Sequence, residues 1–286
     1  MFRIHCKNAI SEEGLQSLLP NFTLTERQEE ADGILVRSAD MHEEKLGEAT
    51  LAVARAGAGV NNIPLERFAE EGVVVFNTPG ANANSVKELV ICEMLLAARN
   101  VIPAVHWVAA HKDAPDIAKE AEKGKKQFAG TEIAGKTLGV IGLGAIGAKV
   151  ANAAHALGMN IVGNSVVIHP IFTAPCEMYD DIAEMVKVCE YITIHVPSLP
   201  ETKGMINKEL IAKMKDGAII LNFARPDLVV NEDIIAGLES GKLRKYLTDL
   251  PSEDLIGKAG VIATPHLGAS TAEAEENCAA MAVDEL

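Results

Sequence analysis

Short apolar runs alternate with stretches of helical periodicity along most of the chain. Glycine, proline or polar residues bound each run, which is typical of buried β-strands. Strands that alternate with helices in this way favour a parallel α/β fold. The predicted strands comprise residues 33–37, 51–55, 73–77, 137–141, 160–163, 191–195, 218–222, 246–249 and 260–263.

Helical periodicity is clearest in residues 85–99 and in the final stretch, 270–286. The final stretch stops without a capping signal, so we expect the chain to continue beyond residue 286. Residues 111–126 are polar and rich in lysine, which predicts an exposed connection. Because a second series of strands and helices follows this connection, we expect a domain boundary close to it.

Composition narrows the classes of partner. The chain has 286 residues, of which 48% are hydrophobic and only 4% aromatic. This is enough for one large or two medium cores, filled mainly by Ala, Val, Ile and Leu. The net charge of −14 disfavours nucleic acid and anionic membranes as partners. An anionic substrate would therefore need local cations or backbone N–H groups to bind.

The five cysteines are odd in number and form no CxxC motif, so we expect neither a disulfide framework nor a metal site. This pattern suits a reducing compartment. The N-terminal sequence MFRIHCKNAI carries charges within its apolar part and is unlike a signal peptide. No apolar run is long enough to span a bilayer. We therefore expect a cytoplasmic protein.

Three glycines, Gly142, Gly144 and Gly147, follow the predicted strand 137–141 in the pattern GxGxxG. A helical pattern at 148–157 comes next, so the motif stands in the strand–turn–helix setting of a dinucleotide-binding loop. In such loops the first glycine permits the tight turn, the second lets the pyrophosphate approach the backbone, and the third lets helix and strand pack closely. The motif predicts a dinucleotide cofactor.

The acidic residue that usually holds the ribose of NAD is missing from its expected place. The next strand ends at Asn164 and Ser165, and the first acid downstream is Glu177. No Lys or Arg lies between Lys149 and Lys187, so NADP is not indicated either. We expect weak binding of NAD(H), with Asn164 and Ser165 as neutral partners of the ribose. The alternative is an irregular loop that holds the adenosine end loosely.

Ionisable side chains follow several strands in the second half of the chain: Arg225, the pair Glu253 and Asp254, and His266. Ligands of open α/β sheets bind outside the carboxyl ends of the strands, so these side chains would gather at one site. Hydride chemistry on a hydroxy acid needs such a set. A cation binds the carboxylate, a base takes the hydroxyl proton, and an acid orients the base.

With these motifs the sequence resembles the D-2-hydroxyacid dehydrogenases over nearly its whole length. The resemblance implies two Rossmann-like α/β domains with doubly wound parallel sheets and an active site in the cleft between them. Residues 1–98, with 271–286 returning to them, would bind the substrate, and 99–270 would bind NAD. The matching stretches are RAGAGVNN at 55–62, NTPGANANSVKELV at 77–90, GKTLGVIGLGAIG at 135–147, YITIHVP at 191–197, ETKGMIN at 201–207, LNFAR at 221–225, TDLP at 248–251 and ATPHLGAST at 263–271.

The resemblance assigns catalytic roles to the side chains at the strand ends. Arg225 would bind the carboxylate and carbonyl oxygen of the substrate, and His266 would be the general acid/base. The family's glutamate maps onto the pair Glu253 and Asp254. Residue type favours Glu253, whereas the spacing from Arg225 fits Asp254. We favour Glu253 and leave Asp254 open.

Binding roles follow from the same resemblance. The backbone of Ala58, Gly59 and Val60 would hold the substrate carboxylate, and Arg37 with Lys87 would hold a phosphate. The implied cofactor contacts are Gly142, Gly144, Ala145, Ile146, Gly147, Asn164, Ser165, His195, Val196, Pro197, Thr202, Ala224 and Asp249.

The resemblance is strongest to members that oxidise 3-phosphoglycerate to 3-phosphohydroxypyruvate with NAD, at the entry to serine biosynthesis, and we expect this reaction. Two alternatives stay open. One is the same chemistry on glyoxylate, hydroxypyruvate or lactate. The other is an NAD(H)-sensing, corepressor-like binding protein of the same fold. The apolar stretch 101–108, which includes Trp107, lies where family members dimerise, so we expect a homodimer.

Overall fold

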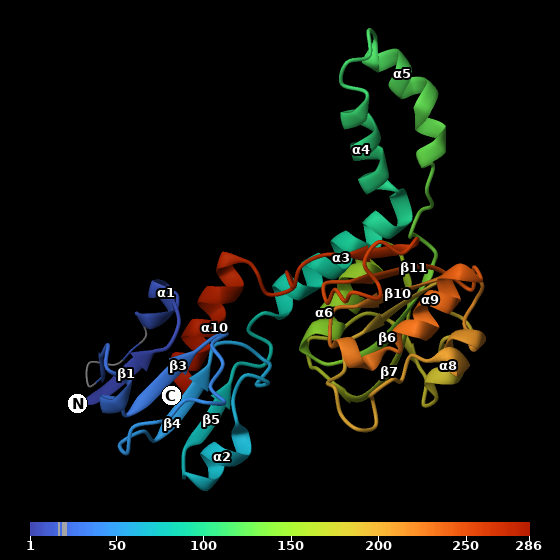
Figure 1. Cartoon of the computed structure of the whole chain (residues 1–286). Coiled ribbons are helices and arrows are strands. Elements are labelled where there is room, and N and C mark those ends of the chain that lie inside the picture. The colour runs from blue at the N-terminus through green and yellow to red at the C-terminus, as the bar shows by residue number, and fades with distance from the viewer. Residues whose placement is uncertain (17, 19–21) are drawn as a thin grey trace. The chain divides into compact units, whose positions relative to one another are not determined.

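The computed structural model describes residues 1–16, 18 and 22–286. These residues form two compact units (Figure 1). Unit 1 comprises Met1–Ser85 and Ala269–Leu286, and unit 2 comprises Val86–Gly268. The chain passes from unit 1 to unit 2 within helix α3, so this division falls earlier than the domain boundary expected at residues 98 and 99.

Unit 1 holds a five-stranded sheet in the order β2-β1-β3-β4-β5, in which every paired strand runs parallel to its neighbour. Successive residues of β3 pack on opposite faces, because Ile34 lies in the core under α2 and Leu35 lies in the core under α10. Both faces are therefore covered, as in a doubly wound fold. The elements are β1 Phe2–Cys6, α1 Glu12–Leu15, β2 Phe22–Leu24, η1 Gln28–Glu30, β3 Gly33–Val36, β4 Ala52–Arg55, α2 Leu65–Glu70, β5 Val74–Asn77 and α10 Ala272–Glu285.

Unit 2 holds a seven-stranded parallel sheet in the order β12-β11-β10-β9-β6-β7-β8. The chain leaves β6 toward β7 and β8 and then crosses to β9, so the strand order reverses beside β6. Such a reversal opens a ligand crevice at the carboxyl ends of the strands. The strands are β6 Thr137–Leu143, β7 Asn160–Ile168, β8 Cys176–Met178, β9 Tyr191–Ile194, β10 Ala218–Asn222, β11 Leu243–Thr248 and β12 Val261–Ala263.

Helices cover both faces of this second sheet. On one face Val140 of β6 packs in a core with Met94 of α3 and Val150 of α6. On the other face Ile141 packs with residues of α7, α8 and α9. The helices are α3 Ala83–Arg99, α4 Val101–Ala110, α5 Ile117–Gly124, η2 Lys125–Phe128, α6 Ala145–Ala156, α7 Ile182–Met185, α8 Lys208–Lys213, η3 Pro226–Leu228 and α9 Asn231–Glu239.

The structure confirms the parallel α/β class and contains a strand at each of the nine predicted places. It also contains β1, β2 and β8, which the sequence analysis missed. In β1 only Ile4 is buried, and β2 and β8 have three residues each, so none of them shows an apolar run. The end of β7 was also misplaced. The strand continues past residue 163 to Ile168, which pairs with Leu143 across a register shift.

The connection expected at residues 111–126 was wrong in part, because it contains helix α5. No described residue of α5 is buried, and the few apolar residues on its one apolar side, Ile117, Ala118 and Ala121, stand among charged residues. A local cap supports it instead: the side chain of Asp116 accepts a hydrogen bond from the backbone N–H of Lys119 at 3.1 Å.

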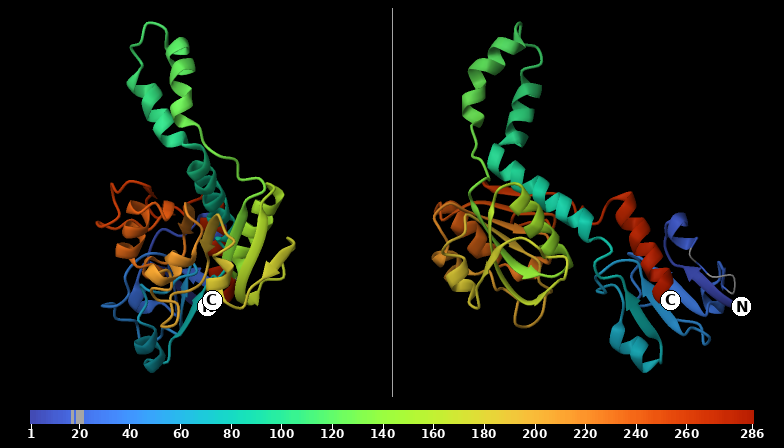
Figure 2. Two further views of the ribbon diagram at one scale, coloured as in Figure 1. Left: turned by 90° about the vertical axis from the view of Figure 1, so that its right-hand side faces the viewer. Right: turned by 180° about the vertical axis from the view of Figure 1, so that it is seen from behind.

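Helices α4 and α5 form a hairpin that stands away from the sheet of unit 2 (Figure 2). Trp107 of α4 stacks on His111, with ring centroids 3.9 Å apart, and meets Phe128 edge-on at 5.9 Å. Within the described residues no single helix has the length and apolarity to cross a membrane, and α3 and α4 reach that length and apolarity only when taken together, across a bend of 66°. The apolar side of α3 is buried in the core of unit 2.

Candidate functional site

The glycine-rich loop joins β6 to α6. Gly142 has a φ of +94°, and a Cβ atom there would lie 2.7 Å from the carbonyl oxygen of His195. A Cβ atom at Gly147 would lie 1.9 Å from the carbonyl oxygen of Gly142. Packing therefore requires glycine at both positions. A Cβ atom at Gly144 would meet no described atom within 4 Å, so the surface there is open to a ligand.

The first turn of α6 fits an anion. Gly144 is the N-cap, and in the described structure no side chain caps the turn that begins with Ala145 and Ile146. The N–H groups of a first helical turn have no partner within the helix and carry partial positive charge. With the open surface at Gly144, this turn suits the pyrophosphate of a dinucleotide.

The polar residues predicted to meet the ribose are engaged with the protein. The Nδ2 atom of Asn164 donates to the carbonyl oxygens of Tyr179 and Asp180, at 2.8 and 3.2 Å. The Oγ atom of Ser165 accepts from the N–H of Leu143 at 2.9 Å and donates to a carbonyl oxygen two residues on. These bonds hold the far end of β7 in place, and the ribose contacts stay a prediction.

His195 and its neighbours lie beneath the glycine loop. The Nε2 atom of His195 lies 2.9 Å from Oγ1 of Thr193, and burial lowers the pKa of the imidazole to about 3. The ring is therefore neutral near pH 7, which suits a packing role. Thr202 donates through Oγ1 to the carbonyl oxygen of Pro197 at 2.7 Å and thus closes the turn after Val196.

Arg225 follows β10 and is half-buried. Its guanidinium donates to the carbonyl oxygen of Ala224 at 2.6 Å, and it forms no ion pair with any described carboxylate. Two buried polar residues set its backbone: Asn222 Nδ2 donates to the Arg225 carbonyl oxygen, and Thr248 Oγ1 donates to that of Asn222, each at 2.8 Å. The sequence analysis missed both. In the sequence, both could have been recognised as polar residues at the end of a buried strand.

The structure separates the two candidate acids, Glu253 and Asp254, from Asp249, which the sequence analysis assigned to the cofactor. Glu253 and Asp254 are exposed in the turn after β11 and form no hydrogen bond or ion pair with any described residue. Asp249, by contrast, is buried, and its Oδ2 atom accepts from the backbone N–H of Gly268 at 2.8 Å. Asp249 also interacts electrostatically with His266. The pairing of His266 with Glu253 or Asp254 stays a prediction.

A second buried acid, on α3, was missed by the sequence analysis. Glu93 of α3 is only 3% exposed. Burial raises the pKa of its carboxyl group to about 7, and the charge of Asp249 adds to this effect. A carboxyl residue on the apolar side of a helix was the available signal, since Val86 and Val90 share that side.

In unit 1, the predicted phosphate ligand Arg37 is paired within the protein. Its guanidinium lies 2.7 Å from Oε1 of Glu275 in α10. A further cation is close by, because Nε of Arg55 donates to the carbonyl oxygen of Arg37 at 3.1 Å. The sequence analysis did not identify Arg55 as a second cation near Arg37. Lys87 lies at the start of unit 2, and its Nζ atom is 3.3 Å from Oε1 of Glu88.

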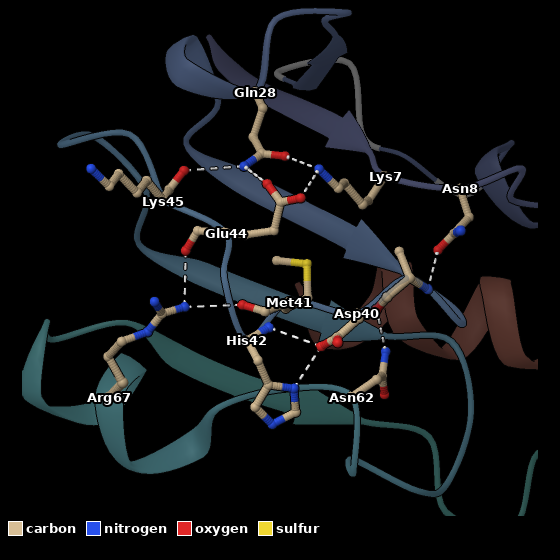
Figure 3. Close-up of polar contacts among 11 residues, drawn as sticks. Lys7, Asn8, Gln28, Asp40, Met41, His42, Glu44, Lys45, Asn62 and Arg67 are labelled. Atoms are coloured by element: carbon tan, nitrogen blue, oxygen red, sulfur yellow. Dashed lines mark hydrogen bonds and ion pairs between the residues drawn. The ribbon is translucent and has the colours of Figure 1, made fainter.

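A polar frame holds the loop that follows β3 (Figure 3). The Oδ1 atom of Asn8 accepts hydrogen bonds from three successive loop N–H groups, that of Arg37 among them, at 3.0–3.2 Å. Asn62 donates through Nδ2 to the carbonyl oxygen of Ala39 at 2.7 Å. Arg67 donates to two further loop carbonyls, each at 2.9 Å. The frame therefore fixes the backbone from which the Arg37 side chain extends.

The predicted carboxylate cradle follows β4. Its first residue, Ala58, accepts a hydrogen bond at its carbonyl oxygen from Nδ2 of Asn77, at 2.6 Å. This bond ties the turn of Ala58, Gly59 and Val60 to the end of β5. The carbonyl of Ala58 is thus engaged, and anion binding by the N–H groups of the turn stays a prediction.

Comparison with known proteins gives a consistent result. Residues 91–268 match the family model described as "D-isomer specific 2-hydroxyacid dehydrogenase, NAD binding domain". The chain is 38% identical over 276 residues to D-3-phosphoglycerate dehydrogenase of Methanocaldococcus jannaschii, covering 92% of this chain and 50% of that relative. It is 36% identical over 298 residues to hydroxypyruvate reductase of Thermotoga maritima, covering 96% and 94%.

Solved structures agree with these sequence relatives. The NAD+-bound 3-phosphoglycerate dehydrogenase of Entamoeba histolytica superposes with a TM-score of 0.78 and 29% identity, over 99% of this chain and 93% of that one. The chain spans about half the length of the curated phosphoglycerate dehydrogenases that it matches.

Proposed function

The chain belongs to the D-isomer specific 2-hydroxyacid dehydrogenase family, and from this we propose that it transfers a hydride between NAD(H) and C2 of a 2-hydroxy acid. One observation carries the proposal. The open surface at Gly144 adjoins the uncapped start of α6. The strand that precedes it, β6, belongs to the same sheet as β10 and β12, which lead to Arg225 and His266. A cofactor site and a set of groups for acid–base chemistry thus share one sheet.

In the proposed mechanism, Gly144 and the first turn of α6 hold the pyrophosphate. The bound nicotinamide supplies a hydride acceptor for oxidation and a hydride donor for reduction. Arg225 binds the carboxylate of the substrate and polarises the oxygen on C2. His266 takes the proton from the C2 hydroxyl group during oxidation and returns it to the oxygen during reduction. Asp249, a buried acid that interacts electrostatically with this histidine, offsets the charge that His266 gains.

We propose 3-phosphoglycerate as the substrate, oxidised to 3-phosphohydroxypyruvate for serine biosynthesis. The names of the relatives support this choice, as do the cations Arg37 and Arg55 near one another in unit 1. Reduction of hydroxypyruvate is the second candidate, because the similarity to the Thermotoga maritima reductase extends over nearly its full length. The two keto acids, 3-phosphohydroxypyruvate and hydroxypyruvate, differ by one phosphate group.

We further propose a cytoplasmic homodimer that buries the hairpin of α4 and α5. Exposed apolar residues on α4 support this assembly, namely Val101, Val105 and Val108. Burial of such residues is the main favourable contribution to association between protein surfaces.

A panel of 2-keto acids tests the function. NADH oxidation is followed with 3-phosphohydroxypyruvate, hydroxypyruvate, glyoxylate and pyruvate. We expect the highest kcat/KM with 3-phosphohydroxypyruvate. A higher value with hydroxypyruvate would move the assignment to the second candidate, and the absence of turnover with every acid would contradict the dehydrogenase function.

A further inference from the structure

Strand β7 contains an irregularity where it runs beside the glycine-rich loop. In its pairing with β6, Ile141 lies opposite Asn164. The next pair is Leu143 with Ile168, so β6 advances two residues over this interval while β7 advances four. Strand β7 therefore carries a bulge, a feature that redirects side chains and is common beside active sites. The bulge lies next to the loop that is proposed to hold the cofactor pyrophosphate.

Leu143, between the first two glycines of the loop, is held by β7 at three points. Its backbone N–H donates to Oγ of Ser165 at 2.9 Å, and its carbonyl oxygen accepts from the N–H of His169, also at 2.9 Å. Its side chain is buried, and a Cβ atom at Gly163 would lie 3.1 Å from its Cδ1 atom. Residues 163–169 thus form a clamp that fixes the glycine loop through Leu143.

The clamp engages the polar groups at the place where a dinucleotide site usually has a carboxylate for the ribose 2′-hydroxyl group. Ser165 donates its only proton to the carbonyl oxygen of Val167 at 2.6 Å and accepts the N–H of Leu143, so one lone pair at most is left. Asn164 donates through Nδ2 to two backbone carbonyls that follow β8. The exposed side chains of Val166 and Val167 are apolar. These residues do not fit the usual hydrogen bonding of the ribose.

We propose that Ser165 is a positioning residue that holds the glycine loop ready for the pyrophosphate, and that the 2′-hydroxyl group of the adenosine ribose is not recognised. This inference rests on the proposed binding of NAD(H) at Gly144. Backbone N–H groups bind an anion better when their directions are fixed beforehand, because less freedom is lost on binding. The clamp supplies this order from β7, so selection of the cofactor falls on its pyrophosphate and nicotinamide half.

A pair of cofactors tests whether the ribose is recognised. The Kd of NADH and the Kd of NADH that lacks the 2′-hydroxyl group of its adenosine ribose are measured by fluorescence titration, without substrate. A carboxylate that accepts this hydroxyl would make the analogue bind roughly tenfold or more weakly. We expect the two Kd values to agree within about twofold, less than the effect of one hydrogen bond. A larger loss with the analogue would overturn the inference.

Variants of Ser165 test the clamp. Ser165→Ala removes the acceptor of the Leu143 N–H and should raise the Kd of NADH and of the analogue by the same factor, at least about threefold. Ser165→Thr keeps an Oγ atom and should restore both affinities. Ser240→Ala, which removes a hydroxyl that donates to a carbonyl oxygen of α9 at 3.2 Å, should change neither. Weakening of NADH alone would show that Ser165 binds the ribose, and unchanged affinities would show that it does not position the loop; either result overturns the inference.

Hydrogen exchange separates the inference from the proposed function. The amide of Leu143, followed by NMR, should be protected in the wild type and should exchange faster in Ser165→Ala. An unprotected amide in the wild type would contradict the clamp. If Ser165→Ala does not fold, this amide and the two cofactors still decide the question in the wild type. If NADH binds but no keto acid is reduced, the proposed function fails alone; if NADH does not bind, both fail.

Discussion

The backbone N–H of Gly268 donates to Oδ2 of Asp249 at 2.8 Å, and this hydrogen bond ties the end of β11 to the segment that carries His266. A buried acid is thereby tied to a residue two positions beyond the proposed acid/base, which itself is exposed. Glu253 and Asp254, which the family resemblance favoured, remain exposed in the turn after β11. Burial raises the pKa of the Asp249 carboxyl group, and the charge of His266 opposes this rise.

Replacement of His266 by Asn should lower turnover far more than cofactor binding. The amide cannot exchange the C2 hydroxyl proton, whereas it occupies similar space. General acid–base catalysis contributes roughly 10²–10⁴-fold, so we expect kcat to fall by about that factor. Steady-state kinetics and NADH fluorescence titration measure the two effects. An equal loss of NADH affinity would show that His266 acts in binding instead.

The glycine loop offers a matched pair of variants. Gly144→Val places a side chain in open space, so the thermal midpoint should hold while the Kd of NADH rises at least about tenfold, since the pyrophosphate loses its approach. Gly147→Ala places a Cβ atom 1.9 Å from a carbonyl oxygen and should lower stability by about 1–3 kcal/mol. Calorimetry and NADH titration separate the two effects. Unchanged NADH affinity in Gly144→Val would contradict the proposed phosphate site.

The ion pair between Arg37 and Glu275 leads to a prediction about the phosphate. Such partly exposed pairs contribute only about 0–1 kcal/mol, so a substrate phosphate can replace the glutamate. Glu275→Gln should lower the KM for 3-phosphohydroxypyruvate, and Arg37→Ala should raise it. Neither change should alter the KM for hydroxypyruvate by more than about twofold. If both substrates respond equally, Arg37 serves the structure of unit 1 rather than the phosphate.

Stability should depend on pH through Glu93. Its pKa is about 7 in the fold and 4.5 when unfolded, so the folded state binds more protons between these values. The stabilising effect of the proton is complete below pH 4.5 and is lost as the pH rises to about 7. Relative to Glu93→Gln, the wild type should lose up to about 3 kcal/mol between pH 4.5 and 8. Thermal melts of both proteins across this range provide the measurement, and parallel curves would contradict the raised pKa.

Local patterns in the sequence predicted the glycine loop and the buried strands well. The motif GLGAIG can be recognised from six consecutive residues, and β10 contains five consecutive buried residues. Contacts between distant segments were beyond such reasoning. Arg37 meets Glu275 across 238 positions, and which side of α3 faces β11 depends on the packing of the whole unit. Helix α5 was missed because it buries no described residue.

Direct transfer of hydrogen to C2 is the central claim, and isotope transfer tests it most directly. The protein is incubated with NADH that carries deuterium at C4 of the nicotinamide and with 3-phosphohydroxypyruvate, and the hydroxy acid formed is examined by NMR and mass spectrometry. We predict a product with a single deuterium atom, bound to C2. A product without deuterium, from cofactor labelled on either face of the ring, or no hydroxy acid at all, would contradict the account.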